Sequence, residues 1–167
     1  MKKLLGFSIF LVFVLIASLT AEAKVTLPAI FSDNMVLQQN TQVNVWGKAA
    51  PGEKVTVKAS WLDKAVTAKA AANGKWTVKL KTPKATTNQS VTVSGENEIT
   101  INNVLIGEVW LCTGQSNMEF PVSRHPDVKW NTGMLNEAEE LKDADYPEIR
   151  LFHVKHQLAH EGELDDC

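Results

Sequence analysis

The sequence predicts an antiparallel β-sandwich followed by the incomplete start of an α/β domain. Short segments of alternating apolar and polar residues, separated by turn residues, recur up to residue 105, which is typical of an antiparallel sandwich. The pattern then changes to a continuous apolar run, a turn, a segment of helix formers and another apolar segment. That order is how an α/β fold begins. We therefore expect one domain over residues 24–105 and the start of a second over residues 106–167.

Residues 1–23 have the three parts of a secretory signal peptide. Two lysines precede an apolar run over residues 4–19, and Ala21 and Ala23 place small residues at positions −3 and −1 of a cleavage site. A retained membrane anchor is the alternative, but a run of sixteen residues is short for a membrane span. We expect cleavage after Ala23 and a secreted or periplasmic product with no stable membrane anchor.

The charge of the mature chain limits the classes of partner. Residues 24–167 carry 15 lysines and arginines against 18 aspartates and glutamates, a formal balance of −3. Such a mild charge excludes a nucleic-acid binder that depends on counterion release, and also a polybasic membrane surface. No cysteine lies near the cleavage site, so a lipid-anchored lipoprotein is not expected either.

The expected strands of the first domain are short, and turn residues bound them. Pro51-Gly52 separates the first two strands, and Asn73-Gly74 supplies the positive φ that a tight hairpin turn needs. The alternating pattern predicts strands over residues 43–46, 54–61, 65–71, 75–80, 91–93 and 99–101.

Three tryptophans in this region have two interpretations. If Trp46, Trp61 and Trp76 were exposed, they would form an aromatic platform for a sugar. We favour core packing for all three, because each one continues the buried parity of its strand.

The second domain is expected to begin with residues 104–112, which are mostly apolar and do not alternate. A strand covered on both faces, as in a parallel sheet, has this composition. The motif Gly114-Gln-Ser-Asn-Met118 follows it directly, residues 132–143 are rich in helix formers, and residues 149–154 have the pattern of a further strand. The motif is therefore expected at the carboxyl end of a buried strand, where open α/β sheets build their sites.

Ser116 is the residue of this motif that can carry chemistry. A helix that begins at Ser116 would present free N–H groups to an oxyanion, and Gly114 would allow a sharp turn and the approach of a substrate. Met118 stands where the nucleophile motif Gly-x-Ser-x-Gly has its last glycine. From the residues alone, Ser116 is either a helix cap, which is the commoner role, or a nucleophile.

The motif and the preceding residues Ile106-Gly-Glu-Val-Trp-Leu-Cys112 resemble the nucleophile block of sialate O-acetylesterases and related SGNH-type carbohydrate acetylesterases. Residues 27–38 are similar to that family's entry into its β domain. The resemblance covers roughly residues 24–155, because further similar blocks lie at residues 43–52, 73–76 and 149–154. It implies a β-sandwich followed by a flavodoxin-like catalytic domain that cleaves acetyl esters from sugars.

The resemblance also implies roles for particular residues. Ser116 would attack the acetyl group, forming an acetyl-enzyme that water hydrolyses, with Gly114, Gln115 and Asn117 as neighbours that bind the substrate. The substrate would be an O-acetylated sialic acid or an acetylated polysaccharide, and no cofactor or metal would be needed. The family's general base is a histidine in an Asp-x-x-His segment, and this sequence contains no such segment.

The four histidines offer no clear substitute for that base. His125 lies in a Pro-containing loop, where we expect its side chain to be exposed to solvent. His153, His156 and His160 lie within eight positions, but the strand pattern at His153 separates the three, so no metal site is expected.

The number of residues after Ser116 also indicates that part of the catalytic domain is missing. Only 51 residues follow Ser116, whereas a doubly wound domain needs well over about 100 residues in total. We therefore expect this chain to be the N-terminal portion of a longer esterase, and to be inactive alone.

Two other classes of function stay open at this point. One is a secreted sandwich that binds a glycan, and the other is an interaction domain without a ligand. The motif favours the esterase, because a sandwich has no need of a buried strand that delivers a serine.

Cys112 and Cys167 would permit one disulfide in an oxidising compartment. We expect no bridge, because Cys112 lies in an apolar run where a free cysteine acts as a small hydrophobe.

Overall fold

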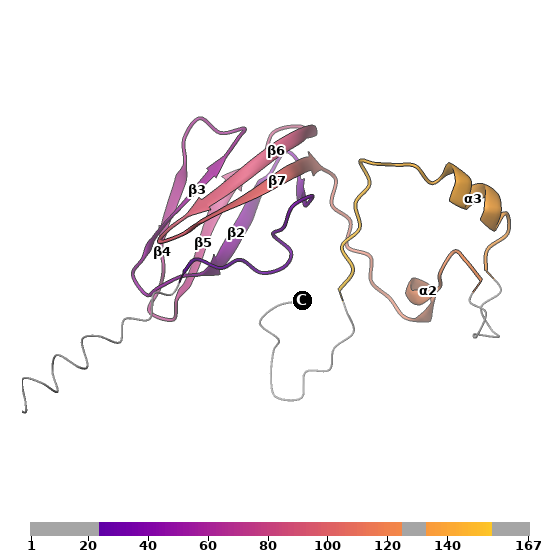
Figure 1. Cartoon of the computed structure of the whole chain (residues 1–167), viewed down its shortest axis with the longest axis horizontal. Helices are drawn as coiled ribbons and strands as arrows, with labels where there is room; N and C mark the ends of the chain where they lie inside the picture. Colours follow the sequence, from indigo (N-terminus) through magenta and orange to yellow (C-terminus); the bar gives the residue numbers. More distant parts are fainter. Residues whose placement is uncertain (1–23, 125–132, 155–167) are drawn as a thin grey trace, which may run out of the picture. The chain divides into compact units, whose positions relative to one another are not determined.

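The structure is a computed structural model that describes residues 24–124 and 133–154 (Figure 1). Among these residues, no helix combines the length and the apolar character that a membrane crossing requires. Several sequence predictions fall outside the described residues: the signal peptide over residues 1–23, His125, His156, His160 and Cys167.

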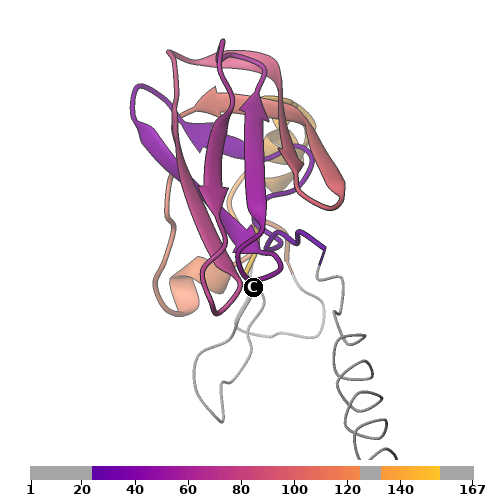
Figure 2. The ribbon, with the colours of Figure 1, turned by 90° about the vertical axis from the view of Figure 1, so that its left-hand side faces the viewer.

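Within the described part, seven strands occupy the chain between residues 36 and 107, and they are seen from a second side in Figure 2. They are β1 (Val36–Gln38), β2 (Gln42–Lys48), β3 (Lys54–Ala59), β4 (Val66–Lys69), β5 (Lys75–Lys81), β6 (Thr86–Ser94) and β7 (Glu98–Gly107). Five of them form a sheet in the order β1-β7-β6-β3-β4, and β2 pairs with β5 in a second sheet. Two short helices follow, α2 (Ser116–Glu119) and α3 (Glu137–Asp143). The expected mostly-β first part is confirmed, while the packing of the sheets as a sandwich stays a prediction.

The alternating sequence explains the strands with a clear inner and outer face. In β5 every second side chain is buried, namely Trp76, Val78 and Leu80, and lysines and a threonine occupy the positions between them. β3 follows the same rule and pairs antiparallel with both β4 and β6. Apolar side chains on one face of each strand thus form the core, and their burial is the main force that holds the sheets together.

Two compact units can be distinguished, and each has its own apolar core. The first contains residues 44–80 and 91–100, and its core includes Val45, Val55, Val57, Trp76, Leu80 and Val93. The second contains residues 29–43, 81–90 and the described residues from Ile101 to Val154, and its core includes Phe31, Met35, Leu37, Val104, Leu105 and Ile106.

The expectation that three tryptophans are buried is correct for Trp76 alone. Trp76 is 3% exposed, whereas Trp46 is 43% exposed and Trp61 is half-buried, in the turn after β3 ends. The prediction was wrong for Trp46 because Val45 is buried, and neighbouring residues of a strand face opposite ways.

One strand pair departs from the expected antiparallel arrangement. β1, for which the sequence pattern predicted no strand, runs parallel to β7, with Val36 opposite Leu105 and Gln38 opposite Gly107.

β7 is also one strand where two were expected. Asn103 within it has a φ of 52°, a left-handed conformation that asparagine tolerates better than most residues. This break explains why Ile101 and Val104 are both buried although three positions separate them, and the burial of Val104 to Ile106 in succession means that this end of β7 is covered on both faces.

The strand expected over residues 104–112 is formed only up to Gly107, as the end of β7, and the strand expected over residues 149–154 is not formed. Residues 108–112 and 149–154 have no regular element, and Leu111 and Leu151 are 90% and 95% exposed. A strand of such apolar composition needs neighbouring strands and covering helices, and the described residues after Gly107 provide only two short helices. The helix expected over residues 132–143 is present in shortened form as α3. The flavodoxin-like second domain and its boundary near residue 105 stay predictions.

Replacement of Gly47 by alanine should test the packing between β2 and β5. A Cβ atom at this position would overlap the Thr26 carbonyl oxygen and lie 2.9 Å from Trp76 Cζ2. We expect Gly47→Ala to lower the free energy of unfolding in urea by about 1–3 kcal/mol, the usual cost of overpacking. Gly107→Ala is the matched control, because its Cβ would meet nothing closer than Val36 Cγ1 at 4.0 Å. Equal stability of the two variants would contradict the packing described.

Candidate active site

The segment that leads to the serine motif leaves the sheet at the end of the β1–β7 pair. The Gln39 N–H donates to the Gly107 carbonyl oxygen at 2.8 Å. The Nε2 groups of Gln38 and Gln39 donate to the two carboxylate oxygens of Glu108, at 3.0 Å and 2.7 Å. The Val109 N–H donates to Gln38 Oε1 at 2.8 Å. Two glutamine side chains at the end of β1 therefore fix the first residues after β7.

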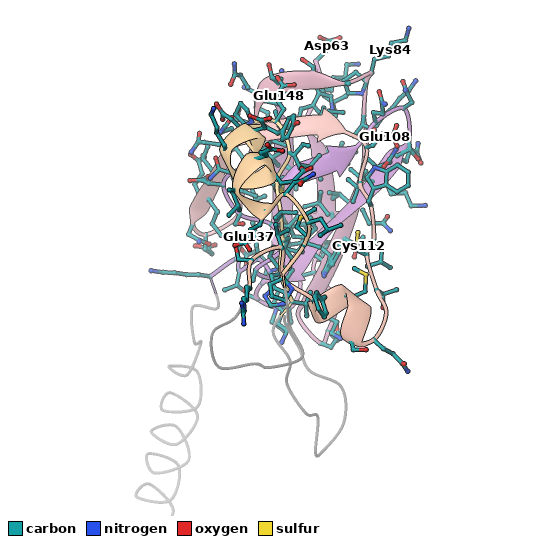
Figure 3. The ribbon with its side chains drawn as sticks, turned by 90° about the vertical axis from the view of Figure 1, so that its right-hand side faces the viewer. Asp63, Lys84, Glu108, Cys112, Glu137 and Glu148 are labelled. Carbon is teal, nitrogen blue, oxygen red and sulfur yellow. The ribbon has the colours of Figure 1, made fainter. Side chains whose placement is uncertain are left out.

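These hydrogen bonds also affect the pKa of Glu108, which is labelled in Figure 3. They lower the pKa of Glu108, the bond from Gln38 most and the bond from Gln39 next, because both donors favour the ionised carboxylate. Desolvation acts in the opposite direction and is the smallest of the three effects. Its lowered pKa makes the Glu108 carboxylate a weaker base than an ordinary glutamate.

Between this anchor and the motif the chain is exposed to solvent. Trp110 and Leu111 have no apolar cover, and Cys112 has a free, exposed thiol (Figure 3). The expectation of a buried Cys112 was wrong because the strand that would have buried it is not formed.

The motif itself forms the beginning of α2. Gln115 occupies the N-cap position without a side-chain hydrogen bond, and its carbonyl oxygen accepts a hydrogen bond from the Met118 N–H at 2.8 Å. Ser116 is the first helical residue, its side chain is exposed, and Asn117 follows it in the same helix. The helix-cap interpretation of Ser116 is therefore wrong, because the cap position belongs to its neighbour.

Gly114 is required by a close approach and not by an unusual backbone conformation. A Cβ atom at Gly114 would lie 2.6 Å from Met118 Cγ, and its φ is not among the positive values in the chain. The absence of a side chain at Gly114 thus leaves room for the Met118 side chain, and the sharp turn expected at Gly114 stays a prediction.

Over residues 24–124 and 133–154, no group of three or more histidine, cysteine, aspartate or glutamate side chains is arranged to hold a metal ion. His153 is exposed in the segment 149–154, which forms neither helix nor strand. The roles expected for Ser116, Gly114, Gln115 and Asn117 rest on the motif, and the structure adds their placement at the start of α2.

Arg150 is a positioning residue that sequence reasoning missed. Its guanidinium donates to the Asn103 carbonyl oxygen, to Asn103 Oδ1 at 3.1 Å and to the Met35 carbonyl oxygen at 3.4 Å. Asn103 Nδ2 in turn donates to Asn34 Oδ1 at 2.8 Å. These bonds attach the segment 149–154 to the start of the β1–β7 pair. The sequence signal for this contact was Asn102-Asn103, a polar pair that interrupts the apolar strand between the buried residues Ile101 and Val104.

Comparison with solved structures first shows the class of protein. A carbohydrate acetylesterase from Xanthomonas citri is similar in structure, with a TM-score of 0.57 and 36% sequence identity. The similarity covers 62% of this chain and 24% of that chain. The described fold thus matches part of a carbohydrate esterase. No family model matches the sequence.

Curated relatives then test the resemblance to a particular family. The sialate O-acetylesterase of Mus musculus is 31% identical over 150 residues, and that of Homo sapiens is 29% identical over 146 residues. These matches cover 83% and 81% of this chain. The resemblance to the sialate O-acetylesterase family is therefore confirmed. The chain spans about a quarter of the length of these relatives, 26% in both cases.

The anchor at the end of β7 can be tested by titration. Gln38→Ala removes the donor that lowers the pKa of Glu108 most, so we expect that pKa to rise towards its ordinary value. Gln89→Ala is the control, because Gln89 donates to the Thr87 carbonyl oxygen and not to Glu108. Carboxyl carbon NMR shifts followed against pH measure the effect. An unchanged pKa in Gln38→Ala would contradict the hydrogen bonds described.

Proposed function

We propose that this chain carries the nucleophile of a carbohydrate O-acetylesterase, and that Ser116 attacks acetyl esters on sugars. The observation that carries the proposal is the placement of Ser116, exposed at the first position of α2 with the cap position filled by its neighbour. No structural role as a cap then accounts for the serine. The relatives named sialate O-acetylesterase and carbohydrate acetylesterase support the choice of reaction.

The proposed reaction has two steps. In the first, Ser116 Oγ forms a bond to the acetyl carbonyl carbon and gives up its proton to a general base. The tetrahedral oxyanion collapses, and the sugar hydroxyl leaves with that proton. In the second, water attacks the acetyl-enzyme by the same route and releases acetate, which restores the serine.

The local backbone suits this chemistry. The first N–H groups of a helix have no partner within the helix, so the Ser116 N–H is free to donate to the oxyanion. Gly114 has no side chain to stand between the motif and an approaching ester, and Gln115 and Asn117 flank the serine as polar groups for the substrate. We propose these three as substrate-binding neighbours.

The general base is proposed to come from a segment of a longer protein. The sequence contains no Asp-x-x-His segment, the pattern that the family uses for its base, and the relatives are about four times as long as their matched part. We propose in addition that residues 1–23 direct the chain to a secreted or periplasmic location, where acetylated glycans are accessible.

The 167-residue chain alone should hydrolyse an aryl acetate no faster than buffer does. The physical reason is that a serine hydroxyl without a base to take its proton is a weak nucleophile. A version extended to include an Asp-x-x-His segment should be active in the same spectrophotometric assay. Full activity of the short chain would contradict the proposed need for a base from outside it.

In the extended protein, Ser116→Ala should lower kcat by at least about 10³-fold, because removal of a nucleophile leaves only weak residual catalysis. Ser123→Ala is the matched control, since this serine lies seven positions further on and outside the motif. Its kcat should stay within about twofold of the parent value. Near-normal turnover by Ser116→Ala would rule out the nucleophile assignment.

A further inference from the structure

The outer face of the β2–β5 sheet has side chains that the proposed esterase reaction does not use. Its members are exposed and alternate with the buried residues of each strand. They are Asn44, Trp46 and Lys48 in β2, and Lys75, Thr77 and Lys79 in β5. We call these six residues the Trp46 face.

The register of the two strands fixes which of these side chains are neighbours. The Ala49 N–H donates to the Gly74 carbonyl oxygen at 2.9 Å, and the Thr82 N–H donates to the Thr41 carbonyl oxygen at 2.9 Å. Both bonds belong to one antiparallel register. The positions that face each other across the strands are then Trp46 and Thr77, Asn44 and Lys79, and Lys48 and Lys75.

This register places Trp46 at a position diagonal to two lysines of the neighbouring strand. Trp46 is 43% exposed, and Lys75 and Lys79 lie at the positions diagonal to it, roughly 7–8 Å away between backbones, which long side chains can span. An exposed indole offers a flat apolar surface to the C–H face of a sugar ring. Flanking ammonium groups favour a ring that carries a negative charge.

The charge around this face has a consistent sign. Neither β2 nor β5 contains a carboxylate. Residues 24–107 carry ten lysines against five carboxylates, whereas residues 108–167 carry five basic and thirteen acidic residues. The β part is thus a cationic surface within a chain that is acidic overall, and it attracts anions selectively.

We propose that the Trp46 face binds a carboxylate-bearing glycan, with a sugar ring against the indole of Trp46 and its carboxylate held by Lys75 and Lys79. The inference deepens the proposed function and rests on it for the choice of a carbohydrate. It adds that the glycan is acidic and that side chains of β2 and β5 hold it. Neutral polysaccharides lack the charged group and are not ligands of this face.

The test measures binding by the whole chain, without any catalytic step. Polysialic acid and polygalacturonate are the acidic glycans, dextran is the neutral glycan, and polyglutamate is a polyanion without sugar rings. Calorimetry near 0.15 M salt suppresses unspecific attraction between exposed charges. We expect both acidic glycans to bind, and dextran and polyglutamate to bind at least about tenfold more weakly.

Variants then locate the site. Trp46→Ala and the double variant Lys75→Gln/Lys79→Gln should each weaken binding of polysialic acid at least about tenfold, while Trp46→Phe should retain part of it. The matched control is Lys54→Gln/Lys69→Gln, which removes two exposed lysines that face each other across β3 and β4 but have no aromatic neighbour on those strands. It should change the affinity less than about twofold. Thermal unfolding of each variant confirms that the fold is kept.

Several results would overturn the proposal. They are failure of the parent chain to bind either acidic glycan, equal binding of polyglutamate, unchanged affinity in Trp46→Ala, and an equal loss in the control pair. Ser116→Ala should bind as the parent does, so a failed esterase assignment leaves this measurement unaffected. Loss of glycan binding likewise leaves the aryl acetate assay unaffected.

Discussion

The parallel pairing of β1 with β7 is the contact on which the attachment of two later segments, at residues 108–109 and at Arg150, depends. β1 has only three residues, yet each end of it holds a segment that follows in the sequence. At its end, Gln38 and Gln39 bind the carboxylate of Glu108. At its start, the Met35 carbonyl oxygen accepts from Arg150. A short edge strand therefore lies beside both the segment that leads to Ser116 and the segment that contains Arg150.

The fold was predictable where local pattern decides it. Alternation found β3 and β5 to within a few residues, because one face of each packs on a core. Pattern failed for β1, whose three residues pair with a strand almost 70 positions away. It failed again at residues 108–112, where an apolar run indicates a buried strand only if other elements cover it. The sequence also shows that Val45 and Trp46 must face opposite ways in β2, so the exposure of Trp46 was predictable once Val45 is assigned to the core. Trp46 therefore lies on the outer face of its sheet.

The sequence motif of the candidate site was predictable, but the contacts that position it were not. The five residues from Gly114 to Met118 indicate Ser116 from sequence alone, and the structure adds that Gln115 holds the cap position. The anchor by Arg150 has only a weak sequence signal, the polar pair Asn102-Asn103, because its acceptors are mostly backbone carbonyl oxygens distant in sequence. Any residue type can present a carbonyl, so only the fold reveals the pairing. A base for the serine is likewise not given by composition or spacing.

Covalent trapping of the nucleophile tests the central claim most directly. The protein extended to include an Asp-x-x-His segment is treated with a fluorophosphonate, which bonds to activated serines, and the modified peptide is identified by mass spectrometry. The account predicts a single adduct on Ser116, and none on Ser116 when the 167-residue chain is treated in the same way. An adduct on another serine, with Ser116 unmodified and esterase activity lost, would contradict it.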